Sequence, residues 1–322
     1  MNGKWCVMAA AAVSAASNAG TRPAGILLVA VGVVLIAAGV VFRCSVKTKV
    51  AHQENKTENV KISAESIVGD RKYQQDFFLF TTDGAAPAAM ESGVIAIVCD
   101  GMGGMEGGEI ASRMCAELIY NGFYQLGQID DVCQILKELV SAADAEVSAI
   151  TSQDGRKLKS GTTIVAVVVR GNKAYWVSVG DSRIYFMHNG RLERLTRDHN
   201  FRLLLQEQCN AGLISQEEVD TDQQKEALIS YVGKGGNLIV DVGEVEFGVA
   251  DDDILLLCSD GLYKSIEDDE ISRLTHEYMA DTSRLPGALV RAAMSGGRPG
   301  KHDNITVLAL SRLRHRDVQY IR

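Results

Sequence analysis

Three aspartates of this 322-residue chain stand beside short apolar runs. Residues 95–99 and 254–258 are runs too short for helices, so each is predicted to be a buried strand that ends near an Asp-Gly pair, at Asp100 and Asp260. Asp303 opens a third β-rich run. Three carboxylates at the ends of core strands, without Cys or His in a metal-ligand spacing, indicate a hard-cation site of the Mg²⁺ or Mn²⁺ kind. Such a site predicts metal-assisted chemistry on an oxyanion such as phosphate.

Asp76 is a fourth candidate, because it precedes the apolar residues 77–80. Any one Asp-Gly pair taken alone is more typical of a turn than of a metal site, so the prediction rests on the group. A carboxylate has two oxygens and can bridge two cations about 4 Å apart. Asp100 is the best bridging candidate, since the glycines after it free the backbone to turn and let the Gly101 carbonyl approach a metal.

The elements that must hold these carboxylates follow from hydrophobic periodicity and turn signals. Short turns, including the hairpin signal Asn189-Gly190, force antiparallel pairing of the strands between residues 162 and 196. Residues 201–233 are more polar, and they are predicted to form a flap with helical fragments. Helix pairs between runs of antiparallel strands indicate an α+β fold, with stacked sheets inside and helices outside. The predicted strands are residues 60–66, 77–82, 94–99, 162–169, 174–179, 183–188, 192–196, 238–245, 254–258 and 305–313, and the predicted helices are residues 107–124, 130–151, 266–278 and 285–295.

The composition is ordinary for a globular protein, with 46% hydrophobic and 23% charged residues. The formal net charge of −8 weighs against a general nucleic-acid binder, which carries a basic face, so no nucleic-acid partner is expected. The seven cysteines are odd in number and widely spread, a pattern typical of reduced thiols rather than of a disulfide framework. We therefore expect the folded domain in a reducing compartment.

Residues 24–42 are nineteen consecutive Ala, Gly, Ile, Leu, Val and Phe residues without a charge, about the length that a bilayer core requires of a helix. We expect a transmembrane helix here, in preference to a buried core helix or a signal-peptide core. Four Lys or Arg residues lie between positions 43 and 56, and only Lys4 and Arg22 precede the run. The positive-inside tendency then predicts a single-pass protein of the cell membrane with its C-terminal part in the cytoplasm.

The predicted organisation has five parts. They are a short N-terminal segment at 1–23, the transmembrane helix at 24–42, a polar juxtamembrane linker at 43–59, one folded domain at 60–313 and a tail at 314–322. The Ala-rich residues 5–16 are compatible with a signal-like segment or with half of a hairpin. The pattern leaves the oligomeric state open.

Seven motifs of the predicted domain occur in an ordered series. They are residues 71–76 (RKYQQD), 100–104 (DGMGG), 160–163 (SGTT), 180–183 (GDSR), 195–199 (LTRDH), 259–262 (SDGL) and 303–306 (DNIT). In these motifs and their order, residues 60–313 resemble the metal-dependent type 2C serine/threonine protein phosphatases of the bacterial branch. The N-terminal segment, the transmembrane helix and the linker lie outside the resemblance.

The resemblance implies a four-layer α-β-β-α sandwich, two antiparallel sheets flanked by helix pairs. It implies two Mn²⁺ or Mg²⁺ ions at one end, with a third described in bacterial members near residues 160–163. The implied metal ligands are Asp100 as the bridge, the carbonyl of Gly101, and Asp260 and Asp303 on one ion. Asp76 would hold metal-bound water, and Arg71 would grip the substrate phosphate, because a planar guanidinium matches two phosphate oxygens.

The reaction that the resemblance implies is hydrolysis of phosphoserine and phosphothreonine in proteins. Metal-bound hydroxide would attack phosphorus directly, so no phosphoenzyme would form. The implied partners are phosphorylated proteins, the targets of a serine/threonine kinase. Two alternatives stay open: a non-catalytic protein of the same fold that binds a phosphoprotein, and a hydrolase of a small phosphorylated metabolite.

The chain departs from the family pattern at two positions. Gln75 stands where many members carry Glu, so the second metal is expected to bind more weakly, because an amide adds no charge. Met102 stands where animal members carry His, so the leaving group must take its proton from water or another group. Asp181 and Arg183 are expected to form a structural turn. Residues 198–199 are expected to order the start of the flap.

Overall fold

The computed structural model describes residues 53–57, 60–82, 92–103, 107–126, 129–152, 155–250 and 252–312. The chain divides into two compact units, residues 1–47 and 48–322, and every described residue belongs to the second. Among them no helix combines the length and apolarity that crossing a bilayer demands. The predicted transmembrane helix at 24–42, the segment at 1–23 and the tail at 314–322 lie outside the described residues.

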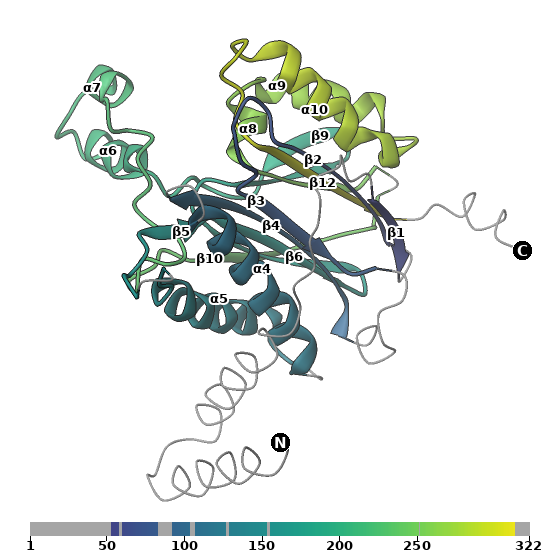
Figure 1. The fold of residues 1–322 in the computed structure, drawn as a ribbon. Helices are drawn as coiled ribbons and strands as arrows, with labels where there is room; N and C mark the ends of the chain where they lie inside the picture. Colours follow the sequence, from purple (N-terminus) through teal and green to yellow (C-terminus); the bar gives the residue numbers. More distant parts are fainter. Residues whose placement is uncertain are drawn as a thin grey trace, which may run out of the picture. The chain divides into compact units, whose positions relative to one another are not determined.

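The strands form two antiparallel sheets (Figure 1). The strands are β1 (Gln53–Thr57), β2 (Val60–Ile67), β3 (Asp76–Phe80), β4 (Val94–Gly103), β5 (Ser160–Thr162), β6 (Ile164–Arg170), β7 (Lys173–Val179), β8 (Arg183–His188), β9 (Arg191–Arg194), β10 (Asp241–Glu246), β11 (Ile254–Cys258) and β12 (Ile305–Arg312). The first sheet has the order β1-β2-β12-β11-β8-β9 and the second the order β10-β7-β6-β4-β3, with β5 paired to β4 beyond the end of β6. The antiparallel pairing predicted from the short turns is therefore confirmed.

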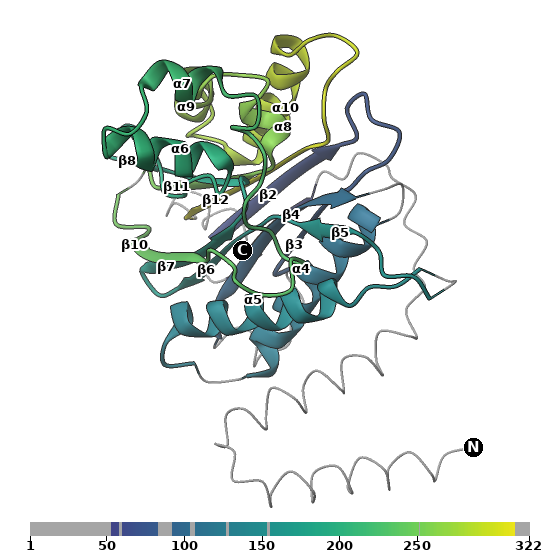
Figure 2. The ribbon, with the colours of Figure 1, turned by 90° about the vertical axis from the view of Figure 1, so that its left-hand side faces the viewer.

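Helices cover the outer face of each sheet. The described helices are α4 (Gly107–Gln125), α5 (Val132–Ser148), α6 (Phe201–Asn210), α7 (Gln216–Thr221), α8 (Asp260–Tyr263), α9 (Asp268–Glu277), the 3₁₀ helix η1 (Thr282–Arg284) and α10 (Leu285–Gly296). α4 and α5 pack on the second sheet, and α8, α9 and α10 pack on the first (Figure 2). The four-layer α-β-β-α arrangement is thus present.

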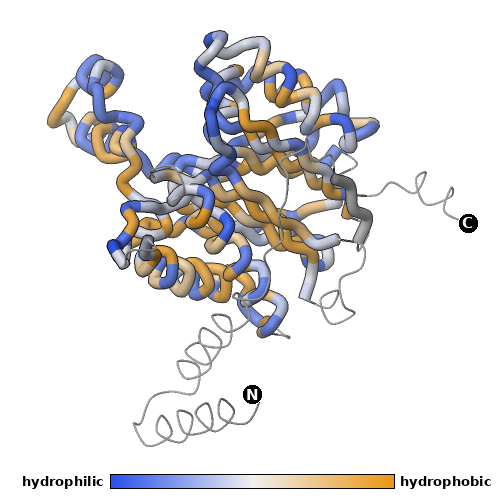
Figure 3. Tube along the Cα trace, in the orientation of Figure 1, coloured by the Kyte–Doolittle hydropathy of each residue, from blue (hydrophilic) through white to orange (hydrophobic). Residues whose placement is uncertain are grey.

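The central strands are apolar on both faces because each face meets another layer. Along β4, Ile95 and Ile97 pack against α4 and α5, while the alternating Ala96 and Val98 pack between the sheets. β11 alternates in the same way between the inter-sheet core and the core under α9 and α10. Figure 3 shows this as continuous hydrophobic colour along the strands of both sheets. Burial on both faces explains the unbroken apolar runs that marked these strands in the sequence.

Two elements differ from the sequence-based boundaries. β1 pairs with β2 inside the stretch for which a linker is predicted, so the first sheet begins before residue 60. Its polar residues carry no hydrophobic periodicity, which explains the difference. β4 does not end at Asp100, because it continues to Gly103 by pairing with β5.

The flap, residues 201–233, lies between β9 and β10 and contains α6 and α7. Figures 1 and 2 show these two helices standing away from the helices on α4 and α5's side of the sheets. α7 begins with a capping box, in which Ser215 and Glu218 each accept from the other's backbone N–H. The predicted polar flap with helical fragments is confirmed.

The described cysteines are all free thiols. Three are buried, Cys99, Cys115 and Cys258, and they pack as small apolar groups inside the strand and helix layers. The expectation of reduced thiols is met for these residues.

Candidate functional site

Strand pairing brings the predicted acidic residues to one end of the two sheets. Asp76 and Asp100 lie directly opposite each other in the β3–β4 register. Asp260 follows β11 and Asp303 precedes β12, and because Cys258 pairs with Val307 in antiparallel register, both aspartates extend past the same end of the first sheet. The four carboxylates are close enough to raise one another's pKa. The grouping predicted from three separate motifs is therefore present.

Asp76 is buried and its two carboxylate oxygens have different surroundings. Ser259 and Thr306 donate hydroxyl hydrogen bonds to Oδ2 at 2.7 and 2.8 Å. Oδ1 is buried and has no hydrogen-bond partner among the described residues. Burial raises the pKa of Asp76 to about 7, against the two hydroxyl hydrogen bonds and with added repulsion from Asp260 and Asp303. The unpartnered oxygen makes Asp76 an acceptor aimed into the site.

Asp100 is fixed through its backbone by the strand opposite. Its N–H donates to the Thr163 hydroxyl at 3.1 Å, and its carbonyl accepts from the Thr163 N–H and the Thr162 hydroxyl, both at 2.9 Å. Burial, followed by the charge of Asp260, holds the pKa of the Asp100 carboxyl well above its usual range. A carboxylate placed in this way is stabilised by any cation that binds beside it.

Gly101 occupies a position where only glycine fits. A Cβ on this residue would stand 2.2 Å from the carbonyl oxygen of Gly108 and 2.6 Å from that of Gln75. The backbone N–H of Gly101 also donates to the Gln75 carbonyl at 3.1 Å. The start of α4 and the start of β3 therefore press against the backbone directly after Asp100.

Arg71 reaches the acidic group from the loop between β2 and β3. Its Nη2 donates to Asp303 Oδ2 at 2.5 Å, and this hydrogen bond and the charge of Asp303 raise the pKa of Arg71. Asn304 shapes the loop, because its Nδ2 donates to the carbonyls of Val68 and Tyr73 at 2.8 and 3.0 Å. The guanidinium side chain is 61% exposed, so it is available to a ligand at the surface of the site.

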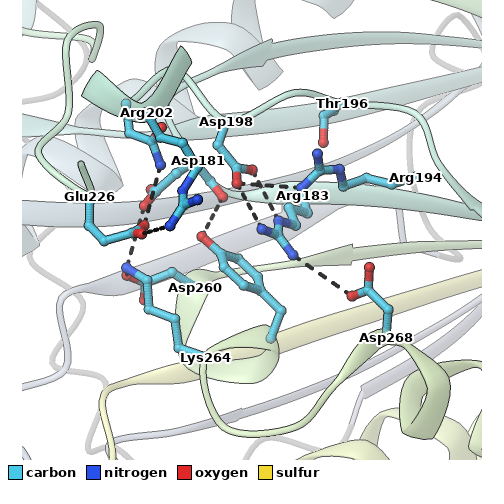
Figure 4. A network of polar contacts seen from close by, with 12 residues as sticks. Asp181, Arg183, Arg194, Thr196, Asp198, Arg202, Glu226, Asp260, Lys264 and Asp268 are labelled. Carbon is cyan, nitrogen blue, oxygen red and sulfur yellow. Dashed lines mark hydrogen bonds and ion pairs between the residues drawn. The ribbon is translucent and has the colours of Figure 1, made fainter. Parts of the chain in front are cut away.

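Lys264 provides a second cation, beside Asp260 and Asp181 (Figure 4). Its Nζ donates to Asp260 Oδ2 and lies 3.5 Å from Asp181 Oδ2. Burial acts to lower the pKa of Lys264, but the charges of Asp260 and Asp181 outweigh it and raise the pKa. Burial and the charge of Asp260 raise the pKa of Asp181 to about 6, although Lys264 opposes this. Asp181 is therefore part of the acidic group and not only of a turn.

Arg183 has the structural role expected for this turn. Its guanidinium donates to both carboxylate oxygens of Asp198 at 3.0 and 2.7 Å, and Cζ lies 3.5 Å over the Tyr263 ring. The Tyr263 hydroxyl donates to the Asp181 carbonyl at 2.9 Å. Figure 4 shows Arg183 between Asp198 and Asp268. This network ties the residues before the flap to the short helix α8 that begins at Asp260.

His199 holds the start of the flap and is fully buried. The Gly180 N–H donates to His199 Nδ1 at 3.1 Å, so the ring proton is on Nε2, which lies 2.9 Å from Asp241 Oδ2. Both ring nitrogens are thus occupied by structural partners. The expectation that residues 198–199 order the start of the flap is confirmed.

The donor atoms suit a hard divalent ion. They are carboxylate and carbonyl oxygens, and the group has an unpartnered buried oxygen in Asp76. As the side chains lie, no three His, Cys, Asp or Glu residues of the described ranges enclose an ion position, while Arg71 and Lys264 hold Asp303 and Asp260. We judge that the residues fit Mn²⁺ or Mg²⁺ in chemistry, and the individual ligand assignments stay predictions. Gln75 donates weakly to the Gly103 carbonyl at 3.4 Å.

Sequence reasoning missed several residues that shape the site. Ser259, Thr306 and Asn304 belong to recognised motifs, yet their spacing does not reveal which side chain each one contacts. Lys264 lies one helical turn after Asp260, and that i,i+4 spacing is the signal that could have indicated an ion pair. Asp154, considered near the third-metal position, lies outside the described residues.

Comparison with known proteins gives consistent matches. Residues 70–294 match the family model described as Protein phosphatase 2C. The serine/threonine phosphatase stp of Listeria monocytogenes is 30% identical over 221 residues, which cover 68% of this chain and 84% of that protein. Protein phosphatase PhpP of Streptococcus pneumoniae is 33% identical over 224 residues, which cover 67% of this chain and 84% of that protein. The catalytic domain of the serine threonine protein phosphatase PstP, solved in complex with two manganese ions, is 26% identical, with a TM-score of 0.59 over 79% of this chain and 99% of that one.

Proposed function

The chain belongs to the protein phosphatase 2C family, and from that premise we propose that it hydrolyses phosphoserine and phosphothreonine in proteins with the help of two Mn²⁺ or Mg²⁺ ions. The observation that carries the proposal is the convergence of Asp76, Asp100, Asp260 and Asp303 at one end of the sandwich. Buried carboxylates that repel one another are costly to a fold, and bound cations remove that cost.

The proposed ion ligands are Asp100, the carbonyl of Gly101, Asp260 and Asp303. A relative of known structure carries two manganese ions, which supports the same number here. Two divalent ions at this position supply a water of lowered pKa and neutralise charge on the phosphate. The hard oxygen donors and the raised pKa values of Asp76 and Asp100 support this assignment.

The chain's own residues hold the water and the substrate. Oδ2 of Asp76 is occupied by Ser259 and Thr306, so only Oδ1 is open to accept a hydrogen bond from water. Arg71 offers a planar fork of donors for two phosphate oxygens, from a loop that Asn304 holds in place. Met102 offers no proton, so the leaving serine or threonine oxygen takes its proton from solvent.

The alternative is a non-catalytic protein that binds a phosphoprotein, and Gln75 is the residue that favours it. Its amide lies against the backbone of Gly103 and contributes no negative charge. The acidic group is otherwise complete, however, and a mere binder has no need of so many buried carboxylates. Calorimetric titration with Mn²⁺ separates the two functions, since a binder of this kind need not take up two ions.

The experiment that tests the enzyme is Mn²⁺-dependent hydrolysis of p-nitrophenyl phosphate and of a phosphothreonine peptide by the full-length protein. We expect activity with Mn²⁺ and a loss of at least about 100-fold in Asp260→Asn, because a metal ligand is removed. Asp269→Asn is the matched control, since Asp269 is exposed in the first turn of α9, and it should keep wild-type activity. A wild-type protein without metal-dependent activity on either substrate contradicts the proposed function.

The proposed location is the cell membrane, with residues 24–42 as a single span and the phosphatase domain in the cytoplasm. The uncharged run and the cations after it support this, as do the free thiols of the domain. Membrane fractions should retain the full chain after carbonate washing and release a variant that lacks residues 24–42. Protection of the domain from protease in intact cells, with digestion after lysis, tests its side of the membrane.

The proposed partners are phosphorylated proteins, the targets of a serine/threonine kinase. The names of the relatives, serine/threonine phosphatases, support this class of substrate. Comparison of phosphopeptides in cells with and without the protein names the substrates. Accumulation of phosphoserine and phosphothreonine sites in its absence is the expected result, and an unchanged set of sites speaks against the proposal.

A further inference from the structure

We propose that Lys264 binds the substrate phosphate as a second cation, on the Asp260 side of the acidic group, as Arg71 does on the Asp303 side. The proposal rests on the proposed phosphatase function. It assigns a role to a residue that neither the motifs nor the predicted ligand set includes.

The position of Lys264 is fixed by α8. Its backbone N–H donates to the Asp260 carbonyl at 3.0 Å, so the side chain starts one helical turn after Asp260 and returns toward it. Nζ contacts Asp260 and lies 3.5 Å from Asp181, and the charge of Asp100 also acts on it. Arg71 is likewise under the charges of Asp303, Asp260 and Asp100. The two cations therefore face the same central carboxylate from two different loops.

Lys264 has the hydrogen-bonding capacity for a ligand. An ammonium has three N–H donors, and its contacts with Asp260 and Asp181 use two of them within the described part of the chain. The side chain is 43% exposed, so the third donor is accessible from solvent. A phosphate oxygen that approaches the acidic group can accept it without breaking either contact.

The balance of charge gives Lys264 its weight. Five carboxylates act on one another here, those of Asp76, Asp100, Asp181, Asp260 and Asp303. Arg71 and Lys264 supply two positive charges, and two divalent ions would supply four more, which leaves one net positive charge for an incoming phosphate dianion. Arg183 and Asp198 neutralise each other and do not alter the count. Without Lys264 the net charge falls to zero, so the attraction for phosphate weakens.

The first test compares Lys264→Gln and Lys264→Arg with wild type in the full-length, Mn²⁺-loaded protein. Lys137→Gln on the exposed face of α5 is the control. We expect Lys264→Gln to raise the KM for a phosphothreonine peptide and the inhibition constant of inorganic phosphate by about 10-fold, with kcat within about twofold of wild type. Lys264→Arg should restore both constants, because it restores the charge, and Mn²⁺ binding measured by calorimetry should not weaken in either variant.

Two results overturn the proposal. An unchanged KM and phosphate inhibition constant in Lys264→Gln show that the ammonium does not meet the phosphate. A lower kcat with unchanged KM, or weaker Mn²⁺ binding, shows that Lys264 only positions Asp260. An inactive wild-type protein contradicts the phosphatase function instead, so the two failures are distinguishable.

A second measurement needs no variant and stands if Lys264→Gln fails to fold. Acetylation of lysines in the Mn²⁺-loaded wild-type protein is followed by mass spectrometry with and without inorganic phosphate. Phosphate should slow acetylation of Lys264 by about fivefold and leave Lys137 unchanged, because a bound anion engages and covers the ammonium. Equal rates of Lys264 acetylation with and without phosphate refute the proposal.

Discussion

The stability of the metal-free domain should fall as pH rises, and Asp76 should be a main cause. The carboxyl is buried, and its pKa rises from the ordinary 3.8 to about 7. Below about pH 4 the folded and unfolded states are both protonated at this group, so the stability is fully present there. As pH rises toward 7 the unfolded chain releases the proton while the folded protein keeps it, and the free energy of unfolding decreases.

The size of the effect follows from the same shift. Each pH unit between the two pKa values removes about 1.4 kcal/mol, so Asp76 taken alone removes about 4 kcal/mol between pH 4 and pH 7. Asp76→Asn has the shape of the protonated carboxyl, and its carbonyl can still accept from Ser259 and Thr306. The variant should therefore match wild type near pH 4 and exceed it by several kcal/mol near pH 8. Some slope should remain, because the pKa values of Asp100 and Asp181 are also raised.

Urea unfolding of the full-length protein in EDTA, at several pH values between about 4 and 8, measures this difference. Asp269→Asn, an exposed aspartate of α9, should follow wild type. Addition of Mn²⁺ should restore the stability of wild type near pH 8 and should do so less for Asp76→Asn. Parallel pH profiles for wild type and Asp76→Asn would refute the reasoning that burial of this carboxylate opposes folding.

Three further outcomes are expected. Arg71→Lys should raise the KM for a phosphopeptide by about 10-fold with little change in kcat, since a point charge replaces a bidentate fork, and an unchanged KM removes Arg71 from phosphate binding. Gln75→Glu should tighten the weaker Mn²⁺ site in calorimetry by about 10-fold, because a charged oxygen replaces an amide, and equal affinity would show that residue 75 is remote from the metals. Arg183→Lys should lower the unfolding free energy by about 2 kcal/mol through loss of the paired hydrogen bonds to Asp198 and of the stack on Tyr263, and a stability equal to wild type in urea unfolding would contradict that.

The layered fold was predictable because its central strands are buried on both faces. Unbroken apolar runs such as residues 95–99 and 254–258 identify such strands without knowledge of their neighbours. β1 was not predictable, because a polar strand is set by its pairing with β2. The continuation of β4 past Asp100 has the same origin, since Gly101 and Met102 pair with residues some sixty positions later.

The candidate site was predictable where strand ends place carboxylates and unpredictable where side chains meet across the fold. Asp76 and Asp100 face each other because adjacent strands carry them, and the sequence marks both. The hydroxyl donors to Asp76 come from Ser259 and Thr306, which are more than 180 residues away in sequence. Contacts over that separation depend on the packing of both sheets, so local spacing does not encode them.

A crystal structure of the full-length protein grown with Mn²⁺, with anomalous scattering recorded at the manganese edge, tests the central claim most directly. We predict two manganese peaks about 4 Å apart, with Asp100 between them and the Gly101 carbonyl, Asp260 and Asp303 as further ligands. Manganese bound elsewhere, or no peak beside Asp100 at saturating Mn²⁺, would contradict it.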